Sequence, residues 1–147
     1  MPRHEDATVS FDVPRLWDDR TIVAYRAPTD GDAVAPNVVV TREQLPPDAD
    51  FVTFADNQVD EVARQLDGFV LHGTRELQVD GLPAVAVGFT SEDQGELVAQ
   101  RMTMVQLPGS RVITITMTAA QADLAQVAPL FERILGSFSF RRPEDSA

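Results

Sequence analysis

Alternating apolar and polar positions predict a chain that is rich in β-strands. The expected strands span residues 7–13, 21–27, 37–42, 69–79, 83–90, 96–107 and 111–118. Short turns at Asp80-Gly81, at 92–95 and at 108–110 separate the last four of them. Because tight turns join antiparallel neighbours, these four strands are expected to form an antiparallel meander.

Two stretches have helical spacing instead. After Pro46-Pro47, Asp48 and Asp50 precede apolar residues that recur every three or four positions up to Leu66, and Asp67-Gly68 ends this pattern. A second helix is expected to follow a capping-box pattern at 118–121. Pro129 lies within it, which predicts either a kink or a helix start near Gln126.

The order of these elements predicts an α+β fold. We expect a single twisted antiparallel sheet of about six or seven strands with two main helices packed on it. At 147 residues the chain fits one domain, expected over 1–140, and the polar tail 141–147 is expected to be disordered.

Composition excludes several classes of function. The absence of cysteine rules out a disulfide framework, a thiolate nucleophile and sulfur-ligated zinc. A net charge of -11 opposes nucleic-acid binding. No stretch approaches the roughly 18 to 20 apolar residues of a membrane-spanning helix, and residues 1–7 do not resemble a signal peptide. We therefore expect a soluble cytoplasmic protein that does not insert into a membrane.

Polar residues do not assemble into a catalytic pattern. His4 and His72 are far apart in the sequence, and Asp18-Asp19 suits a turn where carboxylates accept main-chain hydrogen bonds. Asp30-Gly31-Asp32 lacks the ligand series of a calcium loop. The sequence predicts a non-enzymatic protein without a cofactor or metal.

The segment 96–107 is apolar on both of its alternating faces. Val98, Gln100, Met102 and Met104 share one face by strand parity. Such a face needs a cover, which is either one of the chain's own helices or a partner. The sequence leaves both alternatives open.

Several segments, in this order, resemble one family. The segments are Phe11 to Thr21, Asn37 to Arg42, Gln58, Gln65-Leu66 with Gly68-Phe69, Asp80-Gly81 with Ala84, Gln100, Ile113 to Thr116, and Leu135 to Phe138. From Phe11 to Phe138 the chain resembles the DcrB-related, DUF1795-type proteins of the Mog1/PsbP-like fold. Within that group it is most similar to the Eag chaperones of type VI secretion.

The resemblance implies a homodimeric adaptor without ATP chemistry. Its partner would be a secreted effector whose N-terminal transmembrane segments lie on an apolar, concave sheet face. Glutamines on that face would hydrogen-bond the bound helices, and the matching positions here are Gln58 and Gln100.

Strand and helix spacing extend this surface. Val98 and Met102 share a face with Gln100, and Val62 and Leu66 continue the helical stripe of Gln58. Ile22 and Ala24 are expected to extend the patch from a neighbouring strand. The alternative is a general Mog1/PsbP-like interaction domain unrelated to secretion. The sequence does not decide which sheet face is open, since segment 111–118 has Ile113, Ile115 and Met117 on one side and threonines on the other.

Overall fold

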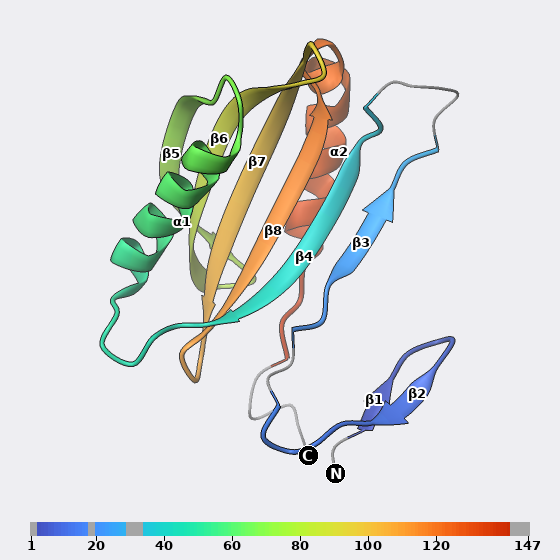
Figure 1. Cartoon of the computed structure of the whole chain (residues 1–147), viewed down its shortest axis with the longest axis vertical. Coiled ribbons are helices and arrows are strands. Elements are labelled where there is room, and N and C mark those ends of the chain that lie inside the picture. The colour runs from blue at the N-terminus through green and yellow to red at the C-terminus, as the bar shows by residue number, and fades with distance from the viewer. Residues whose placement is uncertain (1–2, 18–19, 29–33, 142–147) are drawn as a thin grey trace.

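The computed structural model describes residues 3–17, 20–28 and 34–141. Within them a six-stranded sheet has the strand order β3-β4-β8-β7-β6-β5, and β1 and β2 form a separate hairpin. The sheet strands are β3 (Val23–Arg26), β4 (Asn37–Gln44), β5 (Val70–Val79), β6 (Leu82–Asp93), β7 (Glu96–Leu107) and β8 (Arg111–Ala120). All neighbours pair antiparallel. Figure 1 shows the sheet twisted, with one helix on each side, so the predicted α+β architecture is confirmed.

The predicted meander turns are present. Asp80 and Gly81 both have positive φ angles, 51° and 77°, at the β5–β6 turn. Gln94 and Gly95 do the same, at 51° and 82°, between β6 and β7. Two consecutive residues with positive φ are what a two-residue hairpin turn requires, so these turns fix the antiparallel register.

The edge strand β5 is irregular near its start. Its pairing with β6 shifts between Leu71 and Gly73, which marks a β-bulge. At the bulge His72 Nε2 lies 2.8 Å from the Thr90 hydroxyl of β6. This contact holds the displaced residue against the neighbouring strand.

The first helix, α1 (Phe51–Gln65), begins and ends as expected. The carboxylate of Asp50 accepts hydrogen bonds from the Thr53 hydroxyl (2.7 Å) and the Val52 amide (3.0 Å). These bonds favour the charged form, so they lower the pKa of Asp50. After the helix Gly68 has a φ of +62°, which glycine adopts without strain.

The start of the second helix differs from the expectation. β8 continues to Ala120, a 3-10 turn η1 spans Gln121–Asp123, and α2 runs over Leu124–Gly136 with Pro129 inside it. The capping box predicted at 118–121 is wrong, because Thr118 lies in β8 and its hydroxyl accepts a bond from Gln100. The alternative start near Gln126 is two residues too late.

The N-terminal prediction is only partly right. The strand expected over 7–13 is present but shorter, as β2 (Ser10–Asp12), and it pairs with a strand that was not predicted, β1 (Arg3–Glu5). Figure 1 shows this hairpin below the large sheet. Arg3 Nη1 donates to the Asp12 carboxylate at 2.7 Å, a polar contact that apolar periodicity does not reveal. Within the hairpin, hydrogen bonds from the Val9 amide, the His4 ring and the Thr8 amide lower the pKa of Asp6 to about 2.

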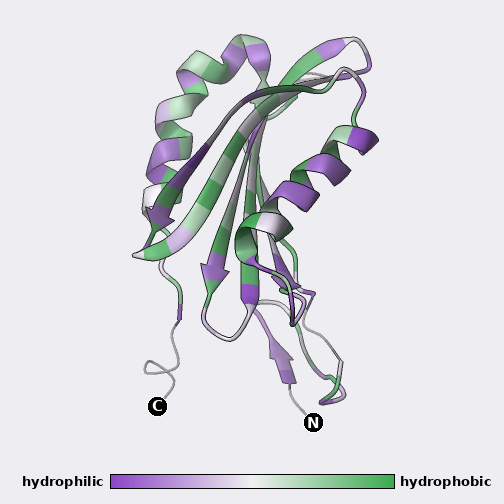
Figure 2. Cartoon of the chain, turned by 90° about the vertical axis from the view of Figure 1, so that its left-hand side faces the viewer, coloured by the Kyte–Doolittle hydropathy of each residue, from purple (hydrophilic) through white to green (hydrophobic). Residues whose placement is uncertain are grey.

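Each helix covers a hydrophobic core on its own side of the sheet. The α1-side core contains Leu45, Phe51, Phe54, Ala55, Val85, Val87, Phe89, Met102, Met104 and Val112. The α2-side core contains Val79, Ala84, Val105, Leu107, Ile115, Met117, Ala119, Phe131 and Leu135. Figure 2 shows alternating hydrophobic and hydrophilic bands on both helices, as expected for helices that cover a core with one face.

Candidate binding face

The two sides of β8 decide which part of the sheet is open. Ile115, Met117 and Ala119 point to the α2 side and are fully buried. Thr114 and Thr116 point to the α1 side, because side chains alternate along a strand, and both are only half-buried. The more apolar side of β8 is therefore the one that the chain covers itself.

The helix α1 covers only part of its side of the sheet. The described residues of the α1-side core come from β6, β7, Val112 of β8 and the α1 region, and none lies in β3 or β4. Figure 1 shows α1 in front of β5 and β6, with β7, β8, β4 and β3 following to one side of it. We call the uncovered α1-side residues the open half; they are Thr114 and Thr116 of β8, Asn37, Val39 and Thr41 of β4, and Ala24 of β3.

None of the residues that make up the open half is charged. Its members are neighbours by register, since Val39 pairs with both Thr116 and Ala24. Among the paired residues of β3, β4 and β8, charged side chains appear on this side only at its two ends, at Arg26 and Glu43. An uncharged surface of threonine, valine, alanine and asparagine accepts apolar groups without burying an unpaired charge.

Gln100 stands where the open half meets the part that α1 covers. It is half-buried in β7, and its Nε2 donates to the Thr118 hydroxyl at 3.0 Å. Both residues line a cavity of about 490 Å³, together with Val98, Leu66 and Asn37. The amide oxygen of Gln100 is a further hydrogen-bonding group at this cavity, since a glutamine both donates and accepts.

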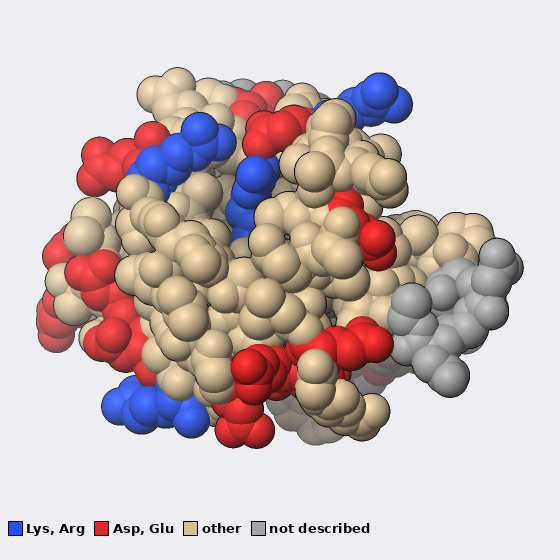
Figure 3. Space-filling view, turned by 90° about the horizontal axis from the view of Figure 1, so that it is seen from above, with Lys and Arg blue, Asp and Glu red and all other residues tan. Residues whose placement is uncertain are grey.

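Acidic residues surround the mouth of this cavity. Asp67, Glu92 and Asp93 line it, from the end of α1 and the end of β6. Figure 3 looks onto this end of the molecule and shows acidic side chains at several places on it, with basic side chains between them. The cavity thus combines an uncharged floor with a negatively charged entrance.

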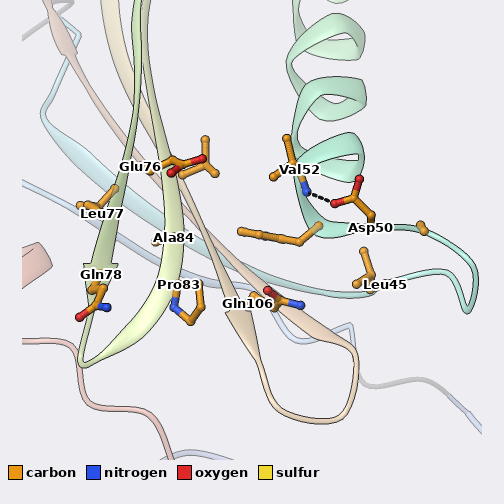
Figure 4. A pocket seen from close by; sticks show the side chains of 12 residues that line it. Leu45, Asp50, Val52, Glu76, Leu77, Gln78, Pro83, Ala84 and Gln106 are labelled. Atoms are coloured by element: carbon orange, nitrogen blue, oxygen red, sulfur yellow. Dashed lines mark hydrogen bonds between the residues drawn. The ribbon is translucent and has the colours of Figure 1, made fainter.

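A second hollow lies at the other end of α1. It has a volume of about 550 Å³. Figure 4 shows Glu76 of β5 across it from Val52 of α1, with Asp50 just before the helix. The Asp50 carboxylate is turned toward its own helix, where it caps the Val52 amide. Because this carboxylate already accepts hydrogen bonds from the start of α1, we assign no ligand to this hollow.

The structure brings three predicted site residues together. Val98, Gln100 and Leu66 line the 490 Å³ cavity. Val98 is 6% exposed, so it forms part of the wall. Gln58 and Val62 are half-buried on α1, and Val62 packs against the α1-side core. Their roles in binding stay predictions.

The remaining predicted site residues do not line this cavity; they lie either at the β3 edge of the sheet or in the α1-side core. Ala24 is exposed on β3, and Ile22, just before that strand, is 65% exposed. Met102 is 6% exposed and belongs to the α1-side core. Of the two alternatives that the sequence left open for this face of β7, a cover from the chain itself is the one found at Met102 and Met104, which pack in the α1-side core.

The residues that β8 and β4 contribute were not predicted from the sequence. Thr118 is the hydrogen-bond partner of Gln100, and Asn37 lines the same cavity. The alternating threonines at 114, 116 and 118 were the available signal. That signal alone did not show which side the second helix would cover.

The other candidate groups stay weak as chemical sites. His4 Nε2 contacts the Asp6 carboxylate at 2.9 Å within the hairpin, and His72 contacts Thr90 in the sheet. Asp18-Asp19 and Asp30-Gly31-Asp32 lie outside the described residues, as does the tail from 142 onward. Over the described ranges, no three His, Cys, Asp or Glu side chains gather in a way that could hold a metal ion. No helix among the described elements is long and apolar enough to cross a membrane.

Comparison with known families identifies the chain. The family model DcrB matches residues 9–137. This chain belongs to the DcrB family. The match includes the whole six-stranded sheet and both helices.

Within the DcrB family the chain is similar to a curated protein, Effector EagT6 from Pseudomonas aeruginosa. The two are 26% identical over 125 residues, which is 85% of this chain and 86% of the relative. This is a distant similarity across almost all of both proteins.

Solved structures share the fold of this DcrB-family chain. A Pseudomonas aeruginosa protein of unknown function, PA94, superimposes with a TM-score of 0.80 at 23% identity, covering 96% of this chain and 97% of the other. LpqN of Mycobacterium tuberculosis, involved in cell envelope biogenesis, gives 0.59 at 16% identity over 80% and 83%. PsbP from Synechocystis sp. PCC 6803 gives 0.53 at 15% identity over 95% and 92%. The predicted PsbP-like fold is confirmed.

Proposed function

We propose that this protein is a non-enzymatic chaperone that holds an apolar helical segment of a partner protein on the open half of its sheet. The observation that carries the proposal is an uncharged, half-exposed sheet face that α1 leaves uncovered, with the Gln100 amide at its border. Family membership and the similarity to EagT6 support it. The partner is then a type VI secretion effector, whose transmembrane segments need shielding from water before export.

The chemistry of the open half suits a transmembrane helix. Such a helix presents apolar side chains, and small residues in it let another backbone approach closely. The open half offers a flat apolar surface, because its apolar groups are short: the threonine methyl groups, Val39 and Ala24. Gln100 adds a neutral group that can donate and accept where the helix backbone is accessible.

The acidic mouth gives the bound segment a preferred direction. Transmembrane helices are often flanked by Lys and Arg. Asp67, Glu92 and Asp93 would attract such a basic flank to the end of the cavity. The apolar part of the segment would then extend across β8 toward β3.

The oligomeric state and the cellular location in this proposal are taken from the family resemblance. The protein is expected to act as a homodimer in the cytoplasm, so that two open halves contribute to one client site. Light scattering of the purified protein measures this directly, and a monomer at micromolar concentration contradicts the dimer without removing the open half.

The binding proposal is tested by co-expression with the N-terminal segments of candidate effectors. Gln100→Glu introduces a charge into the uncharged surface. Gln100 donates to the Thr118 hydroxyl in the wild type, whereas the carboxylate of the variant would accept from it, so the pair keeps a hydrogen bond with its direction reversed. Ala24→Asp places a charge at an exposed position of the same surface. We expect each variant to weaken the complex by at least roughly tenfold, equivalent to about 1.4 kcal/mol, at an unchanged unfolding midpoint.

The matched control is Gln106→Glu. It is the same substitution in the same strand and on the same face, but it lies beside the hollow at the start of α1. We expect it to bind like the wild type. Undiminished binding by both Gln100→Glu and Ala24→Asp contradicts the proposal.

A further inference from the structure

A cavity on the opposite side of the sheet gathers a third of the chain's basic residues. It measures about 570 Å³ and lies between the β3, β4 and β8 strands and the C-terminal segment 138–141. Arg20, Arg42, Arg111 and Arg141 line it, out of 12 basic residues in the sequence. We call it the arginine cleft.

The charge of this cleft contrasts with the rest of the molecule. The sequence has 23 acidic residues, yet Glu43 is the single acidic residue among the described residues that line the cleft. In a chain with a net charge of -11, four guanidinium groups around one cavity create a local positive region. This is the reverse of the acidic mouth beside Gln100.

The floor of the cleft is apolar. Val40 and Ile113 of the sheet lie next to Phe138 and Phe140, and all four pack against the α2-side core. The two phenylalanine rings lie 5.9 Å apart. A ligand that fills this cleft therefore needs apolar groups as well as negative charge.

The wall of the cleft is fixed in place. The amide of Phe140 donates to the Asp80 carboxylate in the β5–β6 turn at 2.9 Å, which ties the C-terminal segment to the sheet. Arg111 Nε donates to the Pro108 carbonyl at 3.1 Å, which orients its guanidinium group. Arg42 also interacts within the chain, so the inference depends on the other three arginines.

These features select one kind of ligand. Guanidinium groups form paired hydrogen bonds with carboxylates, and the arginines come from four separate segments of the chain. A lipid or fatty acid has one anionic head, whereas a peptide has carboxylates along its length with apolar side chains between them. We propose that the arginine cleft binds an acidic, partly apolar peptide segment of a partner protein. This site lies on the α2 side and is independent of the open half.

The test uses a fluorescein-labelled synthetic peptide in which Glu alternates with Leu, titrated with the full-length protein and followed by fluorescence anisotropy. The variant Arg111→Gln/Arg141→Gln removes two guanidinium groups from exposed positions. We expect its dissociation constant to rise at least roughly tenfold, and the affinity of the wild type to fall with added salt. A peptide with Gln in place of Glu is expected not to bind.

The matched control is Arg64→Gln/Arg75→Gln, which makes the same change in net charge at exposed residues outside the cleft. An equal loss of affinity in this control overturns the proposal, because it indicates attraction by overall charge. Binding of phosphatidylglycerol vesicles but not of the peptide also overturns it, in favour of a lipid. A change in molecular mass of the cleft variant in light scattering overturns it in favour of a second copy of this chain. The test is separate from Gln100, so either site can fail alone.

Discussion

The two sides of strand β8 differ in how far the chain's own helices bury them. On one side Ile115 and Met117 are fully buried under α2. On the other side Thr114 and Thr116 stay half-buried, because α1 covers β6 and β7 instead. The chain thus covers the most apolar residues of β8 itself and leaves the threonine side partly exposed.

This difference explains how an open surface stays compatible with water. A bare face of isoleucine and methionine would expose a contiguous apolar patch, which promotes aggregation. Threonine favours strands as strongly as other β-branched residues, and its hydroxyl bonds to water while its methyl group contacts a ligand. The open half is therefore less hydrophobic than the apolar sheet face that the family resemblance implies.

The largest expected effect comes from truncation on the covered side. We expect Ile115→Ala to lower the free energy of unfolding by about 2–5 kcal/mol, because it removes buried methyl groups and leaves a cavity. Thr114→Ala on the other side should change it by less than about 1 kcal/mol. Urea denaturation of the two variants measures the contrast. Equal losses would mean that both sides of β8 belong to the core.

A smaller effect is expected where the open half meets the covered part. Thr118→Val keeps the shape of the side chain but removes the hydroxyl that accepts from Gln100. We expect a loss of about 0.5–1.5 kcal/mol in unfolding free energy. A double-mutant cycle with Gln100→Leu isolates the pair. Additive losses would show that the hydrogen bond contributes nothing to stability.

The smallest effect is expected at the cap of α1 and depends on pH. The pKa of Asp50 is lowered in the folded state from its ordinary 3.8, so its contribution to stability is present above pH 3.8 and is lost as pH falls through the lowered value. Asp50→Ala should therefore be less stable than the wild type near neutral pH and equal to it in strong acid.

Thermal unfolding across this pH range measures that difference, with Asp48→Ala as the control that leaves the cap in place.

Hydrogen exchange sharpens the comparison of the two sides. Amides of β6 near Val87, beneath α1, should lose protection in Asp50→Ala before those near Phe131 of α2. Uniform loss of protection would indicate that both cores respond as one unit.

Local chemistry made much of the fold predictable. Asp50 and Gly68 mark the limits of α1 because a cap and a left-handed glycine act within a few residues. Asp80-Gly81 form the β5–β6 turn because both residues have positive φ angles, which is again a local requirement. The strands of the meander followed from alternation and from these turns.

Contacts between distant residues were not predictable. The Thr118 hydroxyl resembled a helix cap in sequence, but its partner is Gln100 on the neighbouring strand. The hairpin of β1 and β2 depends on Arg3 and Asp12, whose pairing leaves no apolar pattern. The open face depended on the path of α1 across the sheet, which decided that Met102 would be buried and Val39 would not.

The bulge at Leu71 and Gly73 has a consequence for how copies of this chain meet. An outer strand with a regular ladder is a template on which another strand can add, and a displaced residue interrupts that template. The opposite edge, β3, offers only four residues. Both edges of the sheet are thus poor templates for the addition of further strands, and we expect the purified protein to resist fibril growth.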